Sequence, residues 1–135
     1  MTQELNRIMI KEYKALQDLL GALDEQFGYL TKREVFALDG ITRKIENCAR
    51  EVARFEVERR NITKGEAMSK IIDNLKNEEL ENNYRNIKKL LEEIQLQKDT
   101  NELLIRQGLG FTTQMLNFLN PDRGPKTYTA YGKRK

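Results

Sequence analysis

Few residues in this chain could perform covalent or metal chemistry. It has no histidine and no tryptophan, and Cys48 is its single cysteine. Neither Ser-His-Asp and Cys-His catalytic groups nor zinc sites built on histidine or paired cysteines can therefore form. An enzyme would have to work with tyrosine, lysine and carboxylates alone, so catalysis is the least favoured of the functional hypotheses.

The carboxylates give no sign of a catalytic or metal site. They recur beside lysine or arginine, as solvated ion-pair surfaces do, for example at Glu58, Glu78, Glu79, Glu92 and Glu93. A single cysteine cannot form an internal disulfide, so we expect Cys48 to be a small buried hydrophobe in a reducing compartment. We expect no catalytic residue, no metal and no cofactor.

The elements that carry these residues are predicted to be helical. Hydrophobic residues make up 39% and charged residues 33% of the 135 residues, and there are only two prolines. Ala, Glu, Lys, Leu and Arg together supply nearly half of the chain, a composition typical of long helices. No apolar run approaches the roughly 20 residues that a membrane span requires, and no signal peptide is evident. We therefore expect a cytoplasmic protein without membrane insertion.

Apolar residues recur at alternating spacings of three and four along most of the chain. This pattern predicts helices at about residues 2–30, 31–62, 64–75 and 77–119, within one helical domain of residues 1–120. The very short connection between the first two long helices favours an antiparallel hairpin. The expected fold is an all-α antiparallel bundle or coiled-coil hairpin with a long third helix.

Local signals refine these boundaries. Residues 31–34 and 63–66 both read as capping boxes, which predicts that a helix begins at each of them. Gly40 could kink the second helix. Arg59 occupies one position of the helical seams. Because the other seam positions are apolar, tyrosine or cysteine, we expect no cluster of carboxylates in a core.

The segment between Leu103 and Pro121 departs from a plain bundle. Arg106 is its one charged residue, although a third of the chain is charged. On a helical wheel its apolar residues cover about 240° of the circumference, against about 100° for the first helix. The surplus apolar face predicts contact with another protein or another protomer, although a deeply buried bundle helix would show the same composition. Its apolar residues are Leu103, Leu104, Ile105, Leu109, Phe111, Met115, Leu116, Phe118 and Leu119.

The formal net charge of +3 arises in the last residues. Residues 121–135 contain five basic residues and one acidic residue, which leaves residues 1–120 close to neutral. Asn120 and Pro121 predict a helix end, and we expect residues 121–135 to form a flexible basic tail. Because the body has no basic stripe, a nucleic-acid partner is not expected.

The closing part of the chain resembles a known family. Residues 101–109, the Met-Leu-Asn-Phe-Leu run at 115–119 and the tail Thr-Tyr-Thr-Ala-Tyr-Gly at 127–132 are similar to the FlgN-type flagellar export chaperones. The specific match covers about residues 100–132. It implies a cytosolic chaperone that holds the hook-filament junction proteins FlgK and FlgL before type III export.

The resemblance also implies two interaction sites. The client-binding face, taken together with the apolar segment above, comprises Leu103, Leu104, Leu109, Phe111, Met115, Leu116, Phe118 and Leu119. A tail tyrosine of the family is implicated in docking to the export gate protein FlhA. Tyr128 matches it best, and the neighbouring Tyr131 leaves the assignment open between the two.

A self-associating structural or adaptor bundle is the alternative from another class of function. In that hypothesis the surplus apolar face is covered by a homodimer, and there are no export clients. An enzyme comes third.

Overall fold

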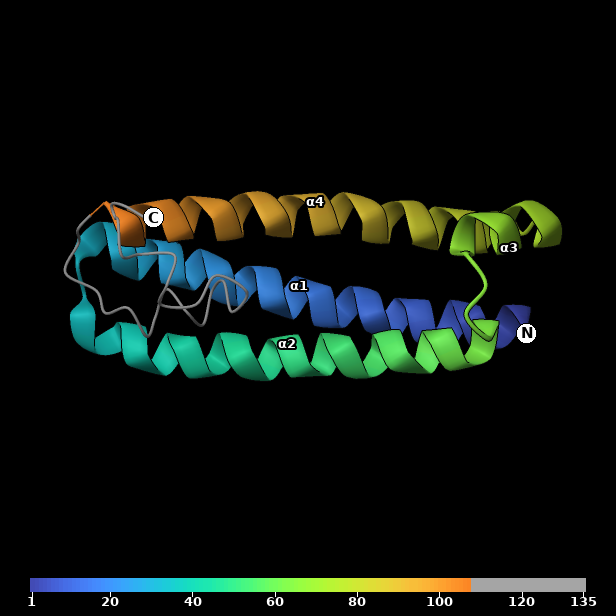
Figure 1. The fold of residues 1–135 in the computed structure, drawn as a ribbon, viewed down its shortest axis with the longest axis horizontal. Helices are drawn as coiled ribbons and strands as arrows, with labels where there is room; N and C mark the ends of the chain where they lie inside the picture. The colour runs from blue at the N-terminus through green and yellow to red at the C-terminus, as the bar shows by residue number, and fades with distance from the viewer. Residues whose placement is uncertain (108–135) are drawn as a thin grey trace, which may run out of the picture.

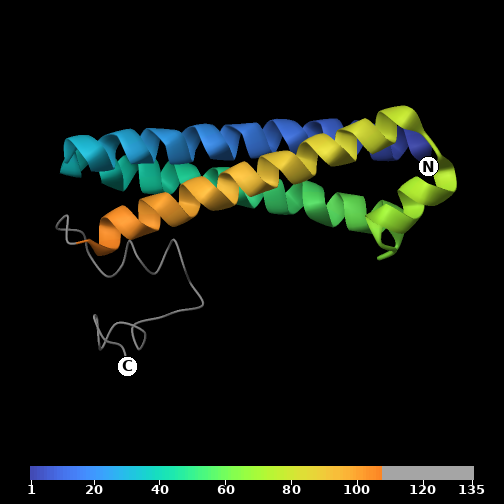
Figure 2. The same cartoon turned by 90° about the horizontal axis from the view of Figure 1, so that it is seen from above.

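The computed structural model describes residues 1–107, which form four helices. They are α1 (Thr2–Lys32), α2 (Val35–Thr63), α3 (Met68–Leu75) and α4 (Glu78–Arg106). α1 lies between α2 and α4 in Figure 1, and each of these two helices packs along it. α2 runs antiparallel to α1, and the chain then reverses through the short α3 so that α4 runs parallel to α1 (Figures 1 and 2). The predicted all-α fold with an antiparallel hairpin is confirmed.

The core follows α1 because two helices cover it. Its buried apolar residues are Leu5, Ile8, Met9, Leu16, Ala22, Leu23 and Leu30 of α1, Leu38, Ile41 and Ile45 of α2, Met68 and Ile71 of α3, and Leu80, Ile87, Leu90, Ile94 and Ile105 of α4. The later seam residues of α2, such as Cys48, Val52 and Phe55, are only partly buried. α2 and α4 hardly approach each other, so within residues 1–107 no second long helix covers that half of α2.

Two ion pairs join α1 and α2 and report their antiparallel register. Lys44 Nζ lies 2.7 Å from Glu25 Oε1, and Arg59 Nε lies 3.0 Å from Glu12 Oε1. As the residue number rises on one helix it falls on the other by nearly the same amount. The two contacts therefore belong to one continuous alignment.

Buried and partly buried amides fix α4 against α1. Asn83 Nδ2 donates to Asn6 Oδ1 at 2.9 Å near the start of both helices. Toward their other ends, Asn101 Nδ2 donates at 2.9 Å both to the carbonyl oxygen of Leu23 and to Gln26 Oε1. Because buried amides must find partners, these contacts restrict how α4 can slide along α1.

The capping box predicted at residues 31–34 is wrong. Thr31 lies in the last turn of α1, where its hydroxyl donates to the carbonyl oxygen of Gly28 at 3.0 Å. Arg33 adopts the left-handed conformation with φ 58°, and the Glu34 N–H donates to the carbonyl oxygen of Tyr29 at 2.9 Å. The residues therefore end α1 through backbone hydrogen bonds, and no side chain caps α2.

The second predicted capping box, at residues 63–66, is wrong for the same reason. Thr63 is the last residue of α2, and Lys64 and Gly65 follow with φ of 55° and 82°. α3 begins only at Met68, without a side-chain cap. Among the helices of residues 1–107, α4 has a side-chain cap: Asn77 Oδ1 accepts from the Leu80 N–H at 2.8 Å.

Two further expectations concern helix continuity. α2 is assigned as one helix through Gly40, so the glycine does not interrupt it. The helix predicted at 77–119 is present from Glu78 to Arg106, and the rest of its predicted length lies outside the described residues.

Candidate functional site

The predicted client-binding face begins at the end of α4. Leu103 has 56% of its surface exposed, whereas Leu104 is partly buried and packs against the core. Consecutive residues on a helix point about 100° apart, so one leucine meets the core while its neighbour faces outward. The other predicted site residues lie outside the described residues: Leu109, Phe111, Met115, Leu116, Phe118 and Leu119 for the client, and Tyr128 and Tyr131 for the export gate.

The helix end that carries Leu103 is held firmly on α1. Asn101 is fully buried, and its side chain bridges to Leu23 and Gln26 of α1 while Gln97 Nε2 donates to its Oδ1 at 3.0 Å. These amides went unnoticed in the sequence because polar residues inside a helical pattern usually face solvent. Their hydrogen bonds fix the position of the end of α4 on α1.

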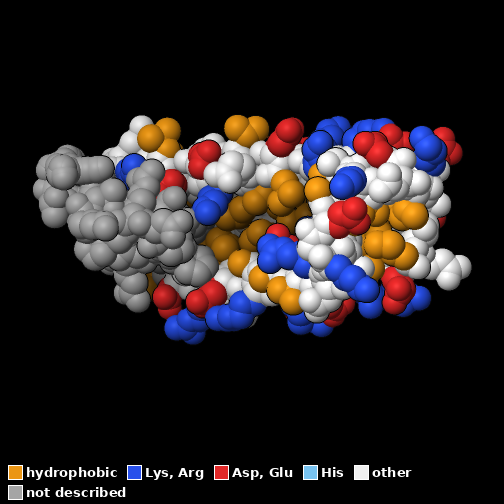
Figure 3. All heavy atoms as spheres, turned by 45° about the vertical axis from the view of Figure 1, so that its right-hand side comes forward, with side chains coloured by type: hydrophobic (Ala, Val, Ile, Leu, Met, Phe, Trp, Pro, Cys, Tyr) orange, Lys and Arg blue, Asp and Glu red, His pale blue; other side chains and the backbone are white. Residues whose placement is uncertain are grey.

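A second candidate surface is a groove of about 320 Å³ between α2 and α4, with α1 as its floor. Figure 3 shows apolar side chains gathered in a hollow between these two helices. The groove exists because both helices pack on α1 but not on each other. Its lining consists of Met9, Glu12, Leu16, Val52, Glu56, Arg59, Met68, Tyr84, Ile87, Lys88 and Leu91.

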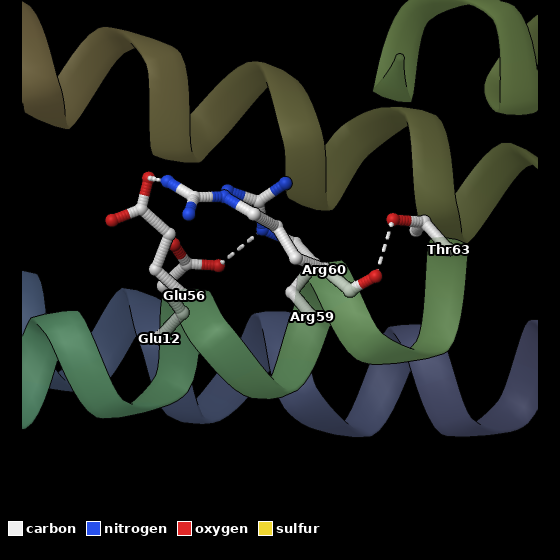
Figure 4. A network of polar contacts seen from close by, with 5 residues as sticks. All are labelled: Glu12, Glu56, Arg59, Arg60 and Thr63. Atoms are coloured by element: carbon white, nitrogen blue, oxygen red, sulfur yellow. Dashed lines mark hydrogen bonds and ion pairs between the residues drawn. The ribbon is translucent and has the colours of Figure 1, made fainter. Parts of the chain in front are cut away.

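The floor of the groove contains a largely buried ion pair. Arg59 reaches from α2 to Glu12 on α1 (Figure 4), and the side chains are 20% and 5% exposed, respectively. Burial raises the pKa of the Glu12 carboxyl, the Arg59 guanidinium opposes that rise, and the nearby Glu56 adds slightly to it. The buried Glu12 carboxylate lies outside the seam positions that the sequence pattern identified. Arg59 in an apolar seam was the available signal, because a buried guanidinium requires an anionic partner.

The groove is lined by two further charged side chains, Glu56 and Lys88. Arg60 Nη2 lies 3.0 Å from Glu56 Oε2, so these two also neutralise each other (Figure 4). Lys88 Nζ lies 5.3 Å from the centre of the Tyr84 ring, a cation–π contact. No carboxylate within residues 1–107 forms an ion pair with Lys88.

Within residues 1–107 no three His, Cys, Asp or Glu side chains are grouped where they could hold a metal ion. No helix in that range is both apolar enough and long enough to cross a bilayer. Cys48 is half-buried, and burial raises the pKa of its thiol. A larger hollow of about 810 Å³ lies at the start of α1 and the end of α2, and it is lined by Met1, Glu4, Asn61, Ile62, Thr63, Lys64 and Glu66.

Residues 1–107 are therefore a small helical bundle with an open groove and an exposed apolar residue at the end of α4. A comparison with protein-family models matches the family described as FlgN protein over residues 1–135, the whole sequence. The chain belongs to the FlgN family, which confirms the resemblance seen at its end. Searches of curated proteins and of solved structures give no match.

Proposed function

We propose that this chain is a cytosolic flagellar export chaperone. It binds the C-terminal helical segments of FlgK and FlgL, prevents their premature association and delivers them to the type III export gate. The match to the FlgN family along the whole sequence carries the proposal. It needs no catalytic step, in keeping with the absence of histidine and the single cysteine.

The client-binding face begins at Leu103 and continues through the low-charge segment that ends at Leu119. An apolar face of this breadth can accept an amphipathic client helix, which buries the client's own apolar stripe. The exposed position of Leu103 on a firmly anchored helix end supports this assignment.

Calorimetric titration with the C-terminal helical segment of FlgK tests the client site. Unaltered protein is expected to bind the segment one to one, with a negative heat-capacity change from buried apolar surface. Leu103→Asp should weaken binding by about tenfold or more, because a buried leucine contributes about 1.5 to 3 kcal/mol. Leu103 is a better probe than Leu104, since Leu104 also packs on the core and its replacement would disturb folding.

Val57→Asp is the matched control, because Val57 is similarly exposed but lies on α2. It should bind the segment as the unaltered protein does. If no segment binds, and light scattering shows a tight homodimer that Leu103→Asp dissociates, the self-associating bundle replaces the chaperone.

Docking to the export gate is proposed to use the tail. Tyr128→Ala and Tyr131→Ala, made separately, should leave FlgK affinity unchanged, and one of them should weaken binding to the cytoplasmic domain of FlhA. Equal loss of client and gate binding in the same variant would contradict separate sites.

A further inference from the structure

The groove between α2 and α4 is an apolar surface that the bundle leaves open. Met9 and Leu16 form its floor, and Val52 on α2 faces Tyr84 and Leu91 on α4. Leu91 is 47% exposed although it points into this hollow. From Tyr84 to Leu91 the groove follows about two helical turns, which is enough to seat apolar anchors spaced i, i+3 and i+7.

The charges of the groove indicate what fits it. Glu12 pairs with Arg59, and Glu56 pairs with Arg60. Lys88 is left without a carboxylate partner within residues 1–107, beside the apolar strip. A complementary ligand therefore combines an apolar stripe with one carboxylate on its edge.

The chain's own last residues lack the charge that would complement this groove. Residues 108–120 contain no aspartate or glutamate. Residues 121–135 contain five basic residues and one acidic residue, and like charges would repel them from Lys88. Charge therefore favours an occupant from another protein.

We propose that this groove docks an amphipathic helix of the export client, with an acidic residue of that helix facing Lys88. The identity of the partner rests on the proposed function. The groove then extends the docking surface of the chaperone beyond the face that begins at Leu103, so that one client segment contacts both.

The test is calorimetric titration of the full-length chain with the C-terminal helical segment of FlgK. Leu91→Asp should weaken binding by about tenfold or more, because it places a carboxylate in the apolar strip. Lys88→Glu should also weaken binding, because it would face the client's acidic residue with a like charge. Lys89→Glu and Leu96→Asp are the controls, since both residues are exposed on α4 outside the groove lining, and both variants should bind normally. Circular dichroism checks that all four variants remain folded.

The outcomes separate the two proposals. If groove variants and controls bind the segment equally well, the groove is not a client site, although the chaperone proposal stands. If the unaltered chain fails to bind the segment, both proposals fall. If Leu91→Asp raises client affinity, the chain's own residues compete for the groove, and if it dissociates a homodimer, a second copy fills it; either result overturns client docking there.

Discussion

The buried ion pair of Glu12 and Arg59 makes a quantitative prediction about stability. Arg59→Met keeps most of the apolar stem but leaves the Glu12 carboxylate unpaired at 5% exposure. Leaving one charge of a buried ion pair without its partner costs about 3 kcal/mol or more, so the free energy of unfolding should fall by that amount. For a chain of this size the melting temperature should fall by about 10 °C.

Replacing Glu12 instead of Arg59 should destabilise the protein less. Glu12→Leu leaves Arg59 unpaired, but its guanidinium is 20% exposed on a flexible stem and can turn toward water. We expect a loss of about 1 kcal/mol for Glu12→Leu. The double variant Glu12→Leu/Arg59→Met removes both charges, and it should match or exceed the stability of the unaltered protein.

The stability lost in Arg59→Met should depend on pH in one direction. Burial raises the folded-state pKa of Glu12 above its ordinary value of 4.5, and removing Arg59 takes away the guanidinium that opposes this rise. A raised carboxyl pKa means that the folded state binds the proton more tightly, so this group's contribution to stability is lost as the pH rises through the folded-state pKa. The deficit of Arg59→Met relative to the unaltered protein should therefore shrink as the pH is lowered from neutral toward 4.5.

Urea unfolding followed by far-ultraviolet circular dichroism at several pH values measures all four proteins. The reasoning is refuted if Arg59→Met is no less stable than Glu12→Leu, or if the double variant is as unstable as Arg59→Met. A deficit that grows on acidification would refute the assigned pKa direction.

Three further predictions concern single side chains. Asn77→Ala removes the cap of α4 and should lower the free energy of unfolding by about 1 kcal/mol in urea titrations. Asn101→Ala leaves Gln26 Oε1 without its buried donor, and the same measurement should show a loss of about 2 kcal/mol. Because burial raises the pKa of the Cys48 thiol, a disulfide reagent should react with it more slowly than with free cysteine at neutral pH, and the rate should increase as the pH rises.

Each of these has its own control. Asn82→Ala changes an exposed asparagine of α4 whose Oδ1 accepts a hydrogen bond from Arg85, so a loss as large as that of Asn77→Ala would contradict the capping role. Gln26→Leu combined with Asn101→Leu should recover part of the loss by removing both polar partners. In urea Cys48 should react with the reagent as fast as free cysteine does. If Cys48 of the folded protein reacted as fast as free cysteine, its burial would be contradicted.

Spacing along the chain was enough to predict the helices. Apolar residues three and four apart can share one side only in a helix, so the three long helices, the short one and the antiparallel hairpin could be predicted. The helix boundaries at Thr31 and Thr63 could not be predicted. A threonine followed by a glutamate three residues later fits a capping box, but it also fits a helix end closed by a left-handed residue, as at Arg33 and Lys64.

For the candidate site, the sequence by itself determined that Leu103 begins a low-charge segment and that Arg59 interrupts an apolar seam. Only the tertiary structure decided that Leu103 faces outward, that Arg59 meets Glu12, and that a groove opens between α2 and α4. The physical reason is that periodicity identifies the apolar side of each helix but not its partner. Here α1 is shared by two helices that hardly approach each other, so the groove arises from their arrangement and from no single stretch of sequence.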